Sequence, residues 1–315
     1  MQVLEKFADL RQGFIDDSRQ GIFDVGILGG VLEGIAEKRF ENEIYNFANQ
    51  NNIPLKVNFV KPQKRYLLAA RAYLKKEANA ASDNVSELKY GDELEIYDIN
   101  GDFARVKSMH DGYFAWLDIR DMVHSLVEPS HQVIALRGHV YEQPRIASKQ
   151  VFELSYGVKL ALSAIDGDWA KVSYAKNSQG FVRKSILEDI GLRLEPIQDS
   201  IVEFAKKFLE TPYTWGGVTA WGLDCSGLVQ TVFAAHGINL PRDADQQAKM
   251  GQEISIEDIQ KADLLFFEGH VVIAIDKNSF IHANANSVRV TIDNFSSEYG
   301  RWLKDRFIVA KRILG

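Results

Sequence analysis

The chain has 315 residues, of which 46% are hydrophobic and 25% charged, and its formal net charge is −6 at pH 7. This composition indicates a globular protein that is too long for one ordinary core, so we expect two to four domains. The acidic balance argues against nucleic acids and anionic membranes as main partners, because neither attracts an acidic surface.

The sequence shows no targeting or membrane-spanning segment. Its first ten residues carry acidic side chains early and lack the unbroken apolar stretch of a secretory signal. No part of the chain approaches the roughly 18 to 20 consecutive apolar residues of a membrane span. We therefore expect a cytoplasmic protein, or a periplasmic or secreted one if an export signal was removed.

Residues 1–65 are expected to form a small α/β unit. Residues 21–25 have the pattern of a strand, and apolar residues at helical spacing predict a helix over 35–49. Asn51 and Asn52, followed by Pro54, mark its end. We expect this unit to pack on the domain that follows.

An internal repeat occupies the middle of the chain. Residues 88–91 recur at 154–157, and residues 102–106 recur at 168–172, in both cases 66 positions later. Each copy consists of short alternating stretches joined by tight turns, which is typical of β-hairpins. The pattern resembles bacterial SH3-like domains.

We therefore predict two small all-β barrels, SH3-like domain 1 at residues 66–126 and SH3-like domain 2 at 127–195. One larger sandwich is the alternative, because two copies alone do not define a boundary. The second barrel is expected to hold its neighbours in register, with a wall-binding module as the alternative.

Residues 196–315 are expected to form an α+β domain. A first helix would be capped by Asp199 and ended by Thr211-Pro212, and a second would run from Cys225 to His236-Gly237. The predicted strands cover residues 264–267, 271–275, 280–283 and 288–292.

The single cysteine, Cys225, follows a glycine-rich turn and begins a predicted helix. Backbone N–H groups and the helix dipole at such a position favour the reactive thiolate. A lone cysteine is more often an inert buried side chain, but His270 and His282 downstream supply candidate partners. This arrangement favours a cysteine nucleophile, which needs an imidazole to take its proton.

The spacing of the two histidines raises a question of register. A two-residue turn at Lys277-Asn278 would place Ile273 opposite His282, and His270 on the other face of the sheet. Contact between the imidazoles therefore requires a longer loop, a bulge or strong twist, and we predict one of these. The chain has no zinc-ligand spacing, and we expect neither a metal nor a cofactor.

The last 120 or so residues resemble the NlpC-type cell-wall cysteine peptidases, which have a papain-like α+β fold. The motifs that carry this resemblance are Tyr213-Thr214-Trp215-Gly216-Gly217, Asp224-Cys225-Ser226-Gly227-Leu228-Val229, Pro241-Arg242-Asp243, His270-Val271 and Ile281-His282-Ala283. The resemblance implies Cys225 as nucleophile, His270 as general base, His282 as the residue that orients the base, and Tyr213 near the oxyanion. A capping role for Tyr213 and a surface role for His282 are the alternatives.

Over nearly its whole length the chain is similar to the γ-D-glutamyl-L-diamino acid endopeptidases (dipeptidyl-peptidase VI type) of murein-peptide recycling. These enzymes cut between D-Glu and diaminopimelate or lysine, and they require a free N-terminal L-Ala. The resemblance therefore implies a tripeptide or tetrapeptide from murein as the substrate. A peptidoglycan-binding wall hydrolase and an acyl-transfer enzyme on the same fold are the alternatives.

A free ammonium group in a closed pocket needs carboxylate and hydroxyl partners. The resemblance assigns Asp243 and Tyr113 to this pocket. Asp83 stands where relatives carry glutamate; its shorter side chain leaves a solvated loop acid as the alternative. The pocket is also expected to be lined by Ser226, Asp224 and Trp215.

Overall fold

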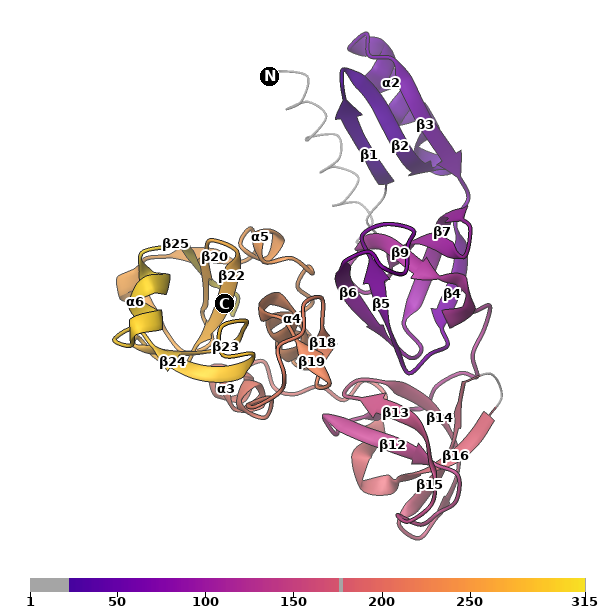
Figure 1. Ribbon diagram of the computed structural model, residues 1–315, viewed down its shortest axis with the longest axis vertical. Helices are drawn as coiled ribbons and strands as arrows, with labels where there is room; N and C mark the ends of the chain where they lie inside the picture. The colour runs from indigo at the N-terminus through magenta and orange to yellow at the C-terminus, as the bar shows by residue number, and fades with distance from the viewer. Residues whose placement is uncertain (1–22, 176–177, 315) are drawn as a thin grey trace.

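The structure is a computed structural model that describes residues 23–175 and 178–314. Residues 1–22, including the start of the first predicted strand, lie outside the described residues. Figure 1 shows three sheet-containing bodies in a row, with a fourth body of helices and sheet beside them. None of the helices in the described part is long and apolar enough to cross a membrane.

The first body is a three-stranded sheet covered by one helix. Strands β1 (Phe23–Leu28) and β2 (Val31–Glu37) are antiparallel, α2 (Glu41–Gln50) follows, and β3 (Leu55–Val60) pairs parallel with β2. The helix begins six residues later than predicted, because Ile35 belongs to β2. Gly34 beside it and β-branched residues favour a strand there.

A seven-stranded sheet forms the second body, with a core that includes Leu74, Leu94 and Val106. Its strands are β4 (Gln63–Leu67), β5 (Arg71–Lys75), β6 (Asn84–Lys89), β7 (Glu93–Asn100), β8 (Phe103–Ser108), β9 (Phe114–Asp118) and β10 (Met122–Val123). Fully buried Lys107 of β8 joins this sheet to the first body, since its Nζ lies 3.5 Å from Glu37 and 2.8 Å from Glu95.

The third body is a second seven-stranded sheet, with Val140, Leu154 and Val172 in its core. Its strands are β11 (His131–Val133), β12 (Arg137–Tyr141), β13 (Gln150–Ser155), β14 (Lys159–Asp166), β15 (Trp169–Tyr174), β16 (Ser178–Arg183) and β17 (Leu187–Asp189).

The two seven-stranded sheets share one strand order and the same irregularities. Read from opposite ends, the orders are β10-β4-β7-β8-β9-β5-β6 and β17-β11-β14-β15-β16-β12-β13. The register shift between Ile96 and Asp98 recurs between Leu162 and Ala164, 66 positions later. The shift after Leu74 likewise recurs after Val140. The sequence repeat is therefore also a repeat of backbone geometry.

Helices and a six-stranded sheet form the fourth body. The helices are α3 (Gln198–Lys206), α4 (Cys225–Ala235), α5 (Ala244–Gln247) and α6 (Glu298–Lys304), and a small hairpin joins β18 (Val218–Thr219) to β19 (Gly222–Leu223). In spatial order the sheet contains β20 (Gln252–Ile254), β25 (Phe307–Arg312), β21 (Leu264–Phe267), β22 (His270–Ala274), β23 (Ser279–Asn284) and β24 (Arg289–Asn294). Short 3-10 turns lie at Lys38–Phe40, Ile119–Asp121, Lys184–Ile186 and Ile256–Asp258.

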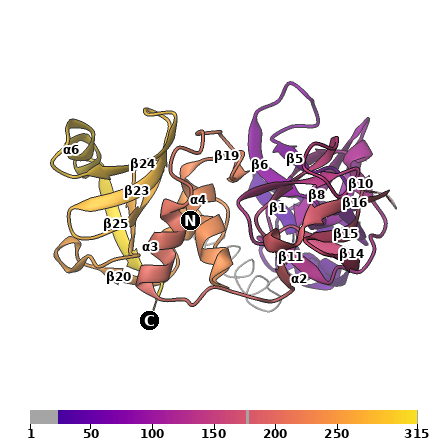
Figure 2. The ribbon, with the colours of Figure 1, turned by 90° about the horizontal axis from the view of Figure 1, so that it is seen from below.

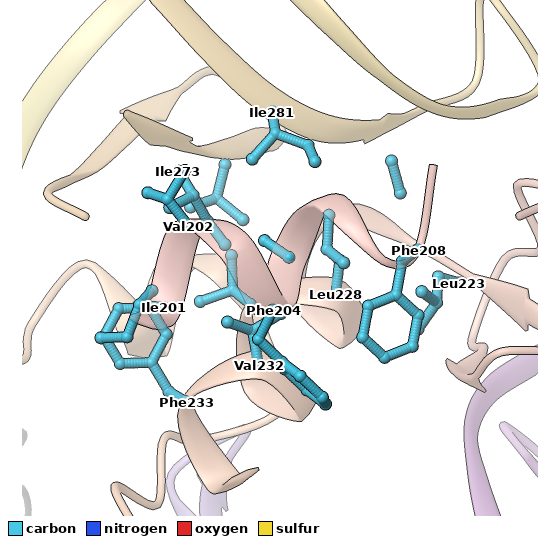
Figure 3. Close-up of a cluster of buried hydrophobic side chains, with 14 of the residues drawn as sticks. Ile201, Val202, Phe204, Phe208, Leu223, Leu228, Val232, Phe233, Ile273 and Ile281 are labelled. Atoms are coloured by element: carbon cyan, nitrogen blue, oxygen red, sulfur yellow. The ribbon is translucent and has the colours of Figure 1, made fainter. Parts of the chain in front are cut away.

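Helix α4 is held between α3 and the sheet by apolar side chains. Figure 3 shows Phe204 of α3, Phe233 of α4 and Ile273 of β22 in this core. Helix α3 differs from the prediction, because Ile197 is its N-cap and Asp199 lies inside the first turn. Helix α4 ends as predicted, at Gly237 in the left-handed conformation with φ +78°.

Candidate active site

Cys225 is the first residue of α4, and its side chain is half-buried. The backbone N–H groups of Ser226 and Val271 donate hydrogen bonds toward its sulfur. Because Val271 follows His270 at the start of β22, this contact brings the backbone at the start of that strand beside the cysteine.

His270 and His282 are in direct contact. Nε2 of His270 lies 2.8 Å from Nδ1 of His282, which is 1% exposed. Ala274 pairs with Phe280, so the hairpin connection is longer than a two-residue turn. This register puts both histidines on one face of the sheet, and the predicted longer loop is confirmed.

The contact between the two rings indicates which nitrogen of His270 carries the hydrogen. Since Nε2 of His270 lies against Nδ1 of His282, Nδ1 of His270 is the ring nitrogen left for another partner. In the tautomer with its hydrogen on Nε2, His270 donates to His282, whose own Nε2 carries the other hydrogen. That second nitrogen is buried with no hydrogen-bond partner among the described residues, and the His282 ring contacts the rings of Phe280 and Tyr299.

Burial keeps both reacting groups neutral. It raises the pKa of the Cys225 thiol to about 11, and the negative charge of Asp224 adds to this rise. Burial also lowers the pKa of His270 to about 4 and holds the pKa of His282 well below its usual range. Desolvation therefore opposes the thiolate that a position at a helix N-terminus favours.

A buried ion pair fixes the turn before the nucleophile. Arg242 is 1% exposed, and its Nη2 lies 2.5 Å from Oδ2 of Asp224. The Asp224 carboxylate also accepts hydrogen bonds from the N–H groups of Gly216 and Gly227, at 2.9 and 2.7 Å. A Cβ on Gly227 would lie 2.1 Å from the Gly217 carbonyl oxygen, so only glycine lets the loop close on α4.

The same arginine reaches the first seven-stranded sheet. Its Nε donates to Oγ of Ser86 on β6 at 3.0 Å, and its Nη1 donates to Oγ of Ser226 at 2.9 Å. The neighbouring Glu87 accepts a hydrogen bond from the Val218 N–H at 3.0 Å. Strand β6 is thus hydrogen-bonded to the loops on both sides of Cys225.

Two predicted substrate-binding residues, Tyr113 and Asp243, come together from different bodies of the molecule. The Tyr113 hydroxyl is hydrogen-bonded to the Asp243 carboxylate. Burial, together with this carboxylate, raises the pKa of Tyr113 to about 12, so the hydroxyl is a donor at neutral pH. Burial also raises the pKa of Asp243, and the charge of Arg242 partly offsets the rise.

Asp83 and Trp215 line a different space, a hollow of about 480 Å³ shared with Asn84 and Thr214. Trp215 is 67% exposed and also borders a larger hollow. Neither Asp224 nor Ser226 lines either hollow. The structure instead places both in the buried network of Arg242.

The larger hollow has a volume of about 720 Å³ and begins at Tyr213, Trp215 and His270. Burial and the nearby Cys225 raise the pKa of Tyr213. Its far wall comes from Glu298, Tyr299 and Trp302 of α6. Within residues 23–175 and 178–314, no group of three or more His, Cys, Asp or Glu side chains could hold a metal ion.

Sequence reasoning missed Arg242, Ser86 and Glu87. Arg242 stands beside Asp243 in a recognised motif, but its pairing with Asp224, 18 positions earlier, depends on the tertiary fold. Nothing in β6 alone indicates that Ser86 and Glu87 face another domain.

Arg242→Ala should lower the free energy of unfolding by about 3–5 kcal/mol, because it leaves the Asp224 charge buried without a partner. Urea denaturation of the full chain measures this loss. The control is Arg120→Ala, which removes an exposed arginine paired with Asp118 and should change nothing measurable. Equal effects of the two substitutions would contradict a structural role for the buried pair.

The alkylation rate of Cys225 by iodoacetamide should be low at pH 7 and rise toward about pH 11, because only the thiolate reacts. Peptidase turnover should persist to low pH and fall as pH drops through about 4, where His270 becomes protonated. An alkylation rate that is already maximal at pH 7 would instead indicate a preformed thiolate–imidazolium pair.

Residues 210–312 match the NlpC/P60 family, and residues 74–122 match the bacterial dipeptidyl-peptidase Sh3 domain. Dipeptidyl-peptidase 6 of Lysinibacillus sphaericus is 26% identical over 257 residues, covering 76% of this chain and 94% of the relative. Gamma-D-glutamyl-L-lysine dipeptidyl-peptidase of Bacillus subtilis is 30% identical over 181 residues, covering 55% of this chain and 60% of the relative.

A crystal structure of an NlpC/P60 family protein from Bacillus cereus has the same fold. It superposes with a TM-score of 0.71 at 22% identity and covers 80% of this chain and all of that one. The matched domains confirm the prediction from the sequence that a peptidase domain follows an SH3-like domain. This chain therefore carries a bacterial dipeptidyl-peptidase SH3 domain and an NlpC/P60 domain, which is a cysteine peptidase domain.

Proposed function

We propose that this protein is a cysteine endopeptidase that cleaves the bond between γ-D-Glu and an L-diamino acid in short murein peptides with a free N-terminal L-Ala. The relatives named dipeptidyl-peptidase 6 and gamma-D-glutamyl-L-lysine dipeptidyl-peptidase support a murein peptide endopeptidase. The observation that carries the proposal is the Tyr113–Asp243 contact, which brings a hydroxyl and a carboxylate together next to Arg242, the partner of Asp224.

In the proposed mechanism, Cys225 is the nucleophile and His270 the general base. As the sulfur attacks the peptide carbonyl, the thiol proton passes to Nδ1 of His270, and Nε2 of His270 stays hydrogen-bonded to His282. The imidazolium then protonates the leaving amine, and water hydrolyses the thioester. The neutral starting pair means that charge develops only during the attack.

The oxyanion that forms needs hydrogen-bond donors. The Ser226 N–H, in the first turn of α4, donates toward the sulfur, and Tyr213 lies close enough for the charge of Cys225 to affect its pKa. We assign oxyanion stabilisation to these groups. The raised pKa of Tyr213 keeps its hydroxyl protonated and therefore a donor.

The substrate ammonium is assigned to Asp243 and Tyr113. A half-buried carboxylate with a hydroxyl partner suits a primary ammonium better than an amide N–H, because the ammonium brings a compensating charge. Trp215 and Asp83 would form the outer wall, whereas Ser226 and Asp224 would act through the Arg242 network. Because the first sheet would close one end of the site, stem peptides still attached to the glycan would be excluded. The enzyme would then cleave only free peptides, as peptidoglycan recycling requires.

We further propose that the second seven-stranded sheet, like the first, is an SH3-like domain, with the four bodies bounded near residues 65, 126 and 195. The shared strand order and the irregularities repeated at a shift of 66 support this assignment. The contacts of the second sheet with the peptidase domain support a scaffolding role for this sheet. The guanidinium of Arg137 lies 5.6 Å from the ring centre of Trp221, four residues before the nucleophile.

Incubation with L-Ala-γ-D-Glu-meso-diaminopimelate or L-Ala-γ-D-Glu-L-Lys should release L-Ala-D-Glu, detected by mass spectrometry. The N-acetylated peptides should be resistant, because they lack the ammonium for Asp243. Cys225→Ala should release nothing while keeping the fold. Equal cleavage of free and acetylated peptides would keep the peptidase but refute the ammonium site.

Asp243→Asn should lower kcat/KM for the free peptide by a factor of thirty or more, since removing one partner of a buried charged contact costs about 2–5 kcal/mol. Asp245→Asn is the matched control, because Asp245 is an exposed aspartate on the same short helix. Steady-state kinetics with both variants separates the two residues. An unchanged kcat/KM for Asp243→Asn would remove its assignment.

A further inference from the structure

We infer that the larger hollow binds the side chain of the residue on the leaving side of the cleaved bond, and that Glu268 and Glu298 select one that ends in an ammonium group and has no carboxylate. Lysine has such a side chain, whereas that of diaminopimelate carries both groups. This inference rests on the proposed function and adds the choice between the two diamino acids.

The larger hollow and the proposed ammonium site lie on opposite sides of Cys225. The Tyr113–Asp243 contact lies where the first seven-stranded sheet meets the peptidase domain. The hollow instead extends from His270 to α6. Figures 1 and 2 both show α6 at the far edge of the molecule from that sheet, with α4 between them. A peptide whose amine is held at Asp243 and whose carbonyl is at Cys225 therefore directs its next residue toward α6.

The hollow carries negative charge. Glu268 lies in the turn before His270, and Glu298 is the first residue of α6; both are exposed and both line the hollow. Among the described residues neither carboxylate has a hydrogen-bond or ion-pair partner. The lining contains no lysine or arginine. Two carboxylates without cations favour a ligand that brings a positive charge.

Aromatic walls suit the rest of a lysine side chain. The rings of Tyr299 and Trp302 are stacked, with centroids 5.4 Å apart, and Trp215 stands on the other side of the hollow. A four-carbon stem packs well on such surfaces while its ammonium stays near water and carboxylates. Arg306 stacks over Trp302 and donates to the Trp302 carbonyl, and it is not part of the lining.

The same features disfavour a second carboxylate. The end of the diaminopimelate side chain carries both an ammonium and a carboxylate, so its net charge is zero. Its carboxylate would meet Glu268 and Glu298 with no cation in the lining to balance it. Because both glutamates are exposed, we expect moderate discrimination, about two- to fivefold per carboxylate.

The test compares L-Ala-γ-D-Glu-L-Lys with the same peptide ending in norleucine, which has an uncharged stem, and with the meso-diaminopimelate peptide. We expect the lysine peptide to have the highest kcat/KM, about fivefold or more above norleucine at low salt. Added salt should narrow that ratio, because it screens exposed charges. The double variant Glu268→Gln/Glu298→Gln should lower the kcat/KM of the lysine peptide to that of the norleucine peptide. The kcat/KM of the norleucine peptide itself should not change.

Glu257→Gln is the control, because Glu257 is an exposed glutamate of the same domain outside the hollow. It should leave all three kcat/KM values unchanged. Lysine no better than norleucine, diaminopimelate equal to or better than lysine, or a double variant with the original preference would each overturn the inference while leaving the peptidase intact. Cleavage of none of the three peptides would overturn the proposed function, and the inference with it.

Discussion

The buried ion pair between Arg242 and Asp224 is the interaction on which the rest of the site depends. Asp224 caps the helix that begins with Cys225, and it also holds the preceding loop through the Gly216 N–H. Arg242 compensates the carboxylate and extends to Ser86 in another domain. A charge buried at this depth requires its partner, which Asp224 supplies from the same domain, while the first sheet adds the hydrogen bonds of Ser86 to Arg242 and of Glu87 to the Val218 N–H.

The same exclusion of water acts on the proposed catalytic pair, Cys225 and His270. Cys225 lies at a helix N-terminus, a position that by itself favours a thiolate, but burial acts in the opposite direction and is the larger effect. His282 supplies His270 with a neutral partner rather than a carboxylate.

Patterns of local origin could be read from the sequence, and contacts between distant segments could not. The hairpin turns, the 66-residue repeat and the ends of α4 follow from local residue preferences. The peptidase and SH3-like recognition is confirmed by the family matches. The partners of Arg242 are Ser86 and the segment Asp224–Ser226, both distant in sequence, so no local pattern predicts them. The sequence indicates the helix N-terminus that favours a thiolate, but it does not indicate the opposing burial of Cys225, which is a property of the whole fold.

Trp221 shows what the second sheet does for the catalytic domain. Its ring lies against Arg137 and His139 of β12, while Arg71 links Glu87 of the first sheet to Glu153 of the second. Glu87 and Glu153 are equivalent positions of the repeat, 66 residues apart. The NlpC/P60 segment excised alone would expose this tryptophan and would leave Arg242 paired with Asp224 but without its hydrogen bond to Ser86.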